Sequence, residues 1–187
     1  MKLKRFKHFS AVNEGHGVLK AQDASKAALF QLERVTSEFF RKAQQKGLAD
    51  SFKSDISPYN NGYELKIEFK TSEQSMMYRF NKAREQGIEE DEVVVPTIVR
   101  FFNNYWSSIR FDVQPETFFD NHLEDDGRAK LNGSYHVFDD RKGRFETVYM
   151  REEVRDTSEI ATAGRLYTQR ASALFEQLLR EMDRFNF

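Results

Sequence analysis

The chain has 187 residues, a length that fits one domain and is enough to bury a substantial hydrophobic core. Its net charge of −1 gives no general attraction to nucleic acid, and the lack of cysteine excludes disulfides, thiolate catalysis and cysteine-based zinc sites. The 18 phenylalanines carry apolar area without a polar group, so they must form a core or a protein interface.

The first 22 residues are basic, and we expect them to form a flexible leader ahead of a single α+β domain over residues 23–187. They lack the long apolar run of a secretory signal. Apolar residues three apart alternate with basic ones, which predicts a short amphipathic helix that docks on a protein or an acidic surface. Nucleic acid is the alternative partner of this segment. The residues expected to contact a partner are Lys4, Arg5, Phe6, Lys7 and Phe9.

The opening sequence "MKLKRFKHFSAVNEG" also resembles the head-targeting leaders of T-even-type tailed phages. Those leaders begin with Met-Lys and interleaved Phe, and they end at an apolar-x-Glu site that the head protease cuts. Here Val12, Asn13 and Glu14 precede Gly15, with Val12 where Leu or Ile is usual. The resemblance covers residues 1–15 alone, and it implies a head-associated virion protein whose leader is removed.

Residues 10–22 are expected to be a loose lead-in, because Gly15 and Gly17 lie among polar neighbours. A helix is predicted over residues 23–46, ending at Gly47. Its apolar residues recur at helical spacing, which predicts one buried stripe. The stripe consists of Ala28, Leu29, Leu32, Val35, Phe39 and Ala43.

A β-hairpin follows, with two alternating runs around Asn60, Asn61 and Gly62. A two-residue loop at Asn60-Asn61 pairs apolar residues with each other and sets Lys53 against Glu68 and Asp55 against Lys66. A loop at Asn61-Gly62 is the better turn chemistry but would oppose Asp55 to Glu68. We therefore predict the first register.

The second strand of this hairpin, residues 63–70, alternates strictly between apolar and charged residues. That pattern is typical of a half-exposed antiparallel strand. The same stretch also resembles the Glu-x-Lys strand of restriction-endonuclease-like enzymes, which bind Mg²⁺ through carboxylates. That alternative would use Asp55, Glu68 and Lys70, with Glu33 or Glu38 as the acid on the helix. We favour the solvated strand and no cofactor.

Two further helices are expected before the second hairpin. The first covers residues 72–86, with Gly87 as its stop, and should bury Met76, Met77, Phe80 and Ala83. The second covers residues 95–110, with Pro96 in its first turn and Tyr105, Trp106 and Ile109 on its buried stripe. A short helix is expected after Pro115.

A second hairpin is predicted over residues 134–150, with residues 140–142 as its tip and Val137 opposite Phe145. The last helix should run from 157 to 184. Its stripe is Ile160, Ala163, Tyr167, Ala171, Leu174, Leu178 and Met182. Phe185 and Phe187 continue past this stripe, so we expect them to contact a partner or a second copy.

These elements predict an α+β fold in which two antiparallel hairpins pack against about four helices, the last of them long. No segment is apolar enough over a sufficient length to span a membrane. No nucleophile or phosphate-binding motif is present. We therefore expect a non-enzymatic protein-binding or structural component, located in the cytoplasm or in a virion. A magnesium-dependent nuclease and a nucleic-acid-binding module are the alternatives.

Overall fold

The computed structural model describes the backbone of residues 3–117, 129–154 and 157–184, and the side chains of residues 22–115, 131–152, 159 and 161–184. Within these ranges the chain forms a five-stranded antiparallel sheet and five helices, an α+β fold. In chain order the elements are α1 (Leu3–Gln45), β1 (Ala49–Tyr59), β2 (Gly62–Thr71), α2 (Glu73–Met76), α3 (Tyr78–Gln86), α4 (Thr97–Tyr105), β3 (Ser108–Thr117), β4 (Ala129–Asp139), β5 (Arg144–Val154) and α5 (Thr157–Arg184).

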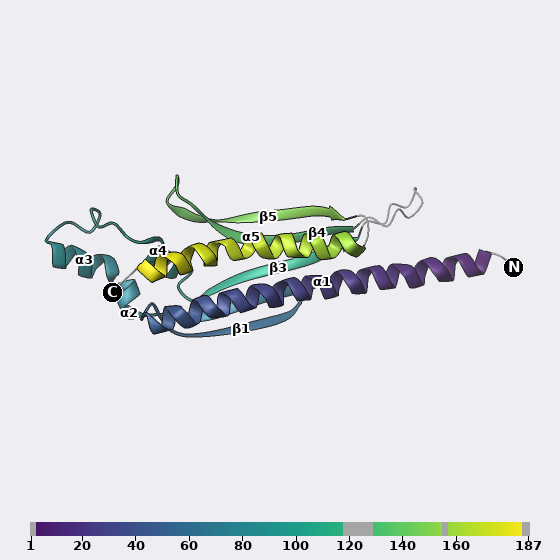
Figure 1. Ribbon diagram of the computed structural model, residues 1–187, viewed down its shortest axis with the longest axis horizontal. Helices are drawn as coiled ribbons and strands as arrows, with labels where there is room; N and C mark the ends of the chain where they lie inside the picture. Colours follow the sequence, from purple (N-terminus) through teal and green to yellow (C-terminus); the bar gives the residue numbers. More distant parts are fainter. Residues whose placement is uncertain (1–2, 118–128, 155–156, 185–187) are drawn as a thin grey trace.

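The two long helices α1 and α5 lie side by side on one face of the sheet (Figure 1). They run in the same direction, because Ala28 of α1 neighbours Thr168 of α5, and Lys42 further along α1 pairs with Asp183 further along α5. Small residues allow their close approach: a side chain at Gly164 would meet the backbone oxygen of Ala24. The strands follow the order β1-β2-β3-β4-β5, so every strand pairs with its neighbour in sequence.

Aromatic rings fill the space between the helix pair and the sheet. Phe39 of α1 contacts Phe101 of α4 at 5.4 Å and Phe175 of α5 at 5.2 Å, measured between ring centroids. Phe40 contacts Phe69 of β2 at 4.8 Å. The expectation that phenylalanine builds the core is confirmed for the rings that have no exposed surface, namely Phe39, Phe40, Phe101, Phe102, Phe111 and Phe175.

The first hairpin has the predicted register. Phe52 pairs with Phe69, Lys53 with Glu68 and Asp55 with Lys66. The buried stripes of the two long helices are also confirmed where side chains are described, with Val35 only partly buried. The C-terminal helix spans Thr157–Arg184, as predicted.

The first helix is much longer than expected. The lead-in predicted over residues 10–22 is wrong, because α1 begins at Leu3 and continues without a break to Gln45. Gly15 and Gly17 each lower helix propensity by about 1 kcal/mol relative to alanine, but they do not interrupt the helix.

The helix predicted over residues 72–86 is divided at Met77, whose ψ of 4° ends α2 before α3 begins. Its predicted burial is mostly wrong: Ala83 is buried, but Met76, Met77 and Phe80 are exposed. The reason is that α3 lies at one end of the molecule and does not cover the sheet (Figure 1). Gly87 ends α3 in the left-handed conformation, as expected for a helix stop.

The helix predicted over residues 95–110 ends at Tyr105, and the following residues form strand β3. Trp106 was expected in the core, but its φ of 28° turns the chain out of the helix and leaves its side chain 68% exposed. Ile109 is buried from the strand instead. The short helix expected after Pro115 is wrong as far as Thr117, which still belongs to β3, and the rest of it lies outside the described residues.

The second hairpin exists, but its register differs from the prediction by one residue. Phe138 pairs with Phe145, and Asp139 pairs with Arg144, so the loop has four residues. Gly143 takes a φ of 63° in this loop, a conformation that glycine adopts without strain. Val137 therefore lies opposite Glu146 and not opposite Phe145.

Strand β4 packs closely against α5 at Gly133. A Cβ atom at this position would lie 2.7 Å from Cε2 of Tyr167, a fully buried ring whose hydroxyl donates to the Ser134 carbonyl at 2.8 Å. We expect Gly133→Ala to lower the free energy of unfolding by about 1–3 kcal/mol, since the added methyl overpacks a rigid contact. Urea denaturation measures the change.

Gly164→Ala is the matched control for this substitution. Its Cβ would lie 3.5 Å from the Ala24 oxygen and 3.6 Å from Ala28 Cβ, which is ordinary contact distance. Because alanine favours a helix interior, the control should be stabilised by about 0.4–1 kcal/mol. Equal effects of the two substitutions would contradict the close packing at Gly133.

Candidate functional site

The charged side of β1 and β2 is a solvated lattice of ion pairs. Glu68 is exposed and pairs with Lys66, whose hydrogen bond and charge hold the pKa of Glu68 below its usual value. Lys70 lies 2.9 Å from Asp50, which raises the pKa of Lys70. Each group is thereby held in its charged form. Exposed pairs of this kind contribute little to stability.

The residues of the nuclease alternative do not all lie on one side of the sheet. Asp55, Glu68 and Lys70 alternate with the buried residues of the hairpin, so they lie on the side of the sheet away from α1. Glu33 of α1 lies on the other side, where it accepts a hydrogen bond of 2.7 Å from Ser54. The sheet therefore separates the helix acid from the other three groups. Among the described residues there is also no cluster of three or more potential metal ligands.

A histidine links three elements where β4 diverges from β3. His136 Nδ1 lies 2.9 Å from the Tyr105 hydroxyl, and His136 Nε2 lies 3.0 Å from the Arg110 carbonyl oxygen. A carbonyl only accepts, so Nε2 carries the proton and Nδ1 accepts from Tyr105. Burial lowers the pKa of His136 and raises the pKa of Tyr105 to about 12. The pair is a neutral structural bridge.

This bridge predicts a loss of stability in acid. The pKa of His136 is lowered in the folded protein, so the unfolded chain binds protons more readily there. Its contribution is present above the ordinary histidine pKa of about 6.5 and is lost as the pH falls through the folded value. Between pH 7.5 and 5.5 the wild type should lose more unfolding free energy than His136→Gln, as urea denaturation at each pH can measure. Parallel pH profiles for the two proteins would contradict the bridge.

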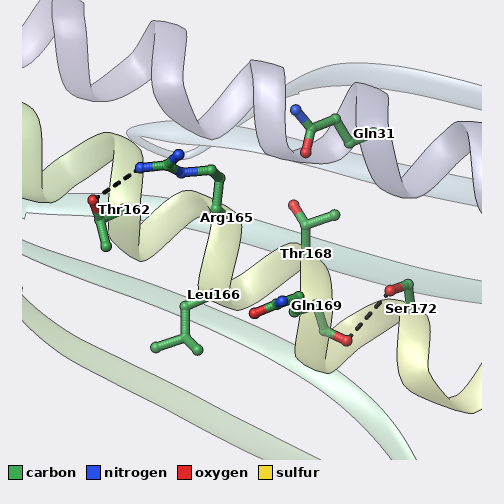
Figure 2. Close-up of a pocket in the computed structure, with 7 residues that line it drawn as sticks. All are labelled: Gln31, Thr162, Arg165, Leu166, Thr168, Gln169 and Ser172. Carbon is green, nitrogen blue, oxygen red and sulfur yellow. Dashed lines mark hydrogen bonds between the residues drawn. The ribbon is translucent and has the colours of Figure 1, made fainter.

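A shallow hollow lies on the surface of the α1–α5 pair, lined mostly by polar residues (Figure 2). Gln31 enters it from α1, and the other lining residues come from α5. Thr168 points toward α1 and donates to the carbonyls of Ala28 at 3.1 Å and Gly164 at 3.0 Å. Ser172 and Arg165 also bond within α5. These polar groups serve the helix pair, and they present no nucleophile with an adjacent base.

Most of the exposed large apolar side chains belong to the connection between β2 and β3, which lies at one end of the molecule (Figure 1). Among the described side chains, nine large apolar residues are exposed, and six of them lie between residues 76 and 106. Val94 is 86% exposed and Trp106 is 68% exposed. This concentration of exposed apolar side chains in one connection makes it a candidate interaction site. We call these six residues the apolar end: Met76, Met77, Phe80, Ile88, Val94 and Trp106.

The connection that carries the apolar end is attached to the rest of the fold at α2 and at both ends of α4. Glu181 of α5 accepts the backbone N–H groups of Thr97 at 2.9 Å and Ile98 at 3.1 Å, which satisfies the first turn of α4. At the other end of α4, Thr71 donates to the Trp106 carbonyl at 2.8 Å. Ser75 of α2 donates to the Leu48 carbonyl at 3.0 Å. The segments on either side of α3 are therefore fixed to the fold.

The acidic run that follows α3 adjoins the apolar end. Its four residues, Glu89, Glu90, Asp91 and Glu92, are all exposed, and we call them the acidic loop. Helical spacing predicts Met76, Met77 and Phe80 on a buried stripe, so it does not reveal the apolar end. The available signal was composition: α3 reads "YRFNKAREQ", with too few apolar residues to cover a core.

The basic N-terminal residues lie on a projecting helix. Gln22 of α1 reaches the Asn61 carbonyl in the β1–β2 turn, and the helix continues past the sheet toward its N-terminus (Figure 1). Lys4, Arg5, Phe6, Lys7 and Phe9 therefore belong to a helix, although their side chains are outside the described set. Phe185 and Phe187 lie outside the described residues altogether.

Across the parts of the chain that the structure describes, no helix is long and apolar enough to cross a membrane. Comparison with protein-family models, with curated proteins and with solved structures finds no match. The surfaces of the molecule are therefore the basis for a functional proposal.

Proposed function

We propose that this chain is a non-enzymatic protein that works by binding protein, as a structural or assembly component. The apolar end carries the proposal, because six large side chains of the β2–β3 connection are exposed, and this connection is attached to the fold at Thr71, Ser75 and Glu181. Contact of these side chains with water is unfavourable in the unbound protein, and a partner that covers them removes that contact. Methionine and tryptophan are also residue types enriched in the buried centres of interfaces.

The proposal is tested by placing a photo-crosslinking amino acid at Phe80 in the full chain and irradiating the cells that make it. We expect a discrete adduct with a protein, since Phe80 is 46% exposed at the proposed interface. The matched control is Gln177, an exposed position on the outer side of α5, which should give no such adduct. Absence of any adduct at Phe80, or the same adducts at both positions, would contradict a binding role for the apolar end.

The N-terminal resemblance extends this proposal to a head-associated component of a tailed phage. The supporting observation is the sequence around Glu14 and Gly15, which lies on the projecting part of α1. Two nearby glycines weaken the helix there, and local opening is what a protease needs to reach the chain.

Incubating the full chain with the head protease of a T-even-type phage tests the extension. Intact mass should show loss of residues 1–14, and Glu14→Gln should block the cut. A bond between Glu14 and Gly15 that stays intact under conditions that cut a known head protein would remove the phage assignment. The binding role of the apolar end would be unaffected.

A further inference from the structure

We infer that the apolar end binds the N-terminal segment of α1 from a second copy of this chain, so that copies associate head to tail. This inference rests on the proposed function and names the partner. The segment in question is residues 3–9, which we call the basic segment. Three properties of the molecule lead to this pairing, namely the positions of the two surfaces, their charges and their apolar content.

The two surfaces lie at opposite ends of the long axis of the molecule. Figure 1 shows the N-terminus of α1 projecting at one end and α3 with its following loop at the other. The 43 residues of α1 form a rod about 65 Å long, which keeps the ends apart. The basic segment therefore cannot fold back onto the apolar end of its own chain, and it is free to meet the apolar end of another.

The charges of the two surfaces are complementary. Before Glu14 the chain carries four lysine or arginine residues and no acid. Residues 73–94 carry six acidic and three basic residues, and the acidic loop holds four of the acids. Lys82 is already paired with Glu85 at 2.6 Å, so this ion pair takes one of the three cations away from competition with the basic segment. Opposite fields of this kind steer association and fix its orientation.

The apolar content also matches. In a helix of 3.6 residues per turn, positions 3, 6 and 9 fall within about 120° of the circumference, so Leu3, Phe6 and Phe9 occupy one face. Such a face binds an exposed apolar surface, as amphipathic helices do in general. Met76 and Met77 are flexible side chains that adapt to the shape of an aromatic partner. The acidic loop, which lies between Ile88 and Val94 in the sequence, would meet the lysines that border that face.

Head-to-tail contact uses two different surfaces on each copy. A bound pair therefore still has a free basic segment at one end and a free apolar end at the other. Such an interface gives open chains unless the geometry closes a ring. We therefore expect the average mass to rise continuously with protein concentration. Exposed charges take part, so added salt should reduce the association.

A charge exchange tests the inference in the full chain. Lys4→Glu/Arg5→Glu/Lys7→Glu reverses the basic segment, and Glu89→Lys/Glu90→Lys/Glu92→Lys reverses the acidic loop. Each triple variant alone should raise the dissociation constant of self-association about tenfold or more in sedimentation equilibrium. An equimolar mixture of the two variants, and a chain that carries all six substitutions, should associate again. The charge-matched control Asp55→Lys/Asp140→Lys/Glu176→Lys should associate like the wild type.

If the mixed variants, or the chain with all six substitutions, associate again, the loss in each triple variant cannot be due to unfolding. This result distinguishes an altered interface from a folding defect. A wild type that stays monomeric at high concentration, or one whose self-association neither triple variant changes, overturns the inference. Loss of DNA binding by the lysine-arginine variant with intact self-association also overturns it, and assigns the basic segment to nucleic acid. If Phe80 then crosslinks a different protein, the proposed function stands without this partner. If Phe80 crosslinks nothing, both fail.

Discussion

The ring packing around Phe39 is the contact on which the rest of the fold depends. This one side chain from α1 touches rings from α4 and α5, and its neighbour Phe40 continues the contact to β2. Edge-to-face aromatic pairs of this kind add roughly 0.5–1.5 kcal/mol beyond the area they bury. Four elements that are distant in sequence thus share one aromatic layer, and the sheet is covered on that face by the helix pair.

The position of this aromatic layer also bears on the apolar end, whose side chains are exposed. The connection between β2 and β3 contains three helices, of which α4 contributes Phe101 and Phe102 to the layer. Helix α3 is held by its neighbours in sequence and reaches beyond the sheet (Figure 1). Ala83 of α3 is buried, whereas Phe80 on the same helix is exposed. The connection is attached to the fold at Glu181 and Thr71, at the two ends of α4.

The parts that sequence reasoning predicted well are those set by local rules. The β1–β2 register follows from matching Lys53 with Glu68 and Asp55 with Lys66, and the buried stripe of α5 follows from helical spacing. Strand β3 was missed because Ile109 satisfies both the helical stripe of the preceding residues and the alternation that continues to Val113. The strand signal in the sequence was the alternation of Ile109, Phe111 and Val113 with polar residues, and these three side chains are buried.

Other features could not be predicted because they depend on tertiary neighbours. Whether Met76 and Phe80 are buried is decided by what lies beside α3, and the sequence of α3 does not specify this. The bridge at His136 arises where β4 leaves β3, so its partners Tyr105 and Arg110 come from other elements. The separation of Glu33 from Asp55 likewise depends on which side of the sheet α1 covers.

The shared direction of α1 and α5 has an electrical consequence. In an antiparallel pair the two helix dipoles cancel, but here they add, with about half a positive charge at each N-terminus and half a negative charge at each C-terminus. The positive ends point toward the basic tip of α1, and the negative ends lie where α4 and its acidic connection are attached (Figure 1). A molecule with a net charge of only −1 therefore has partial charges of opposite sign at the two ends of its helix pair.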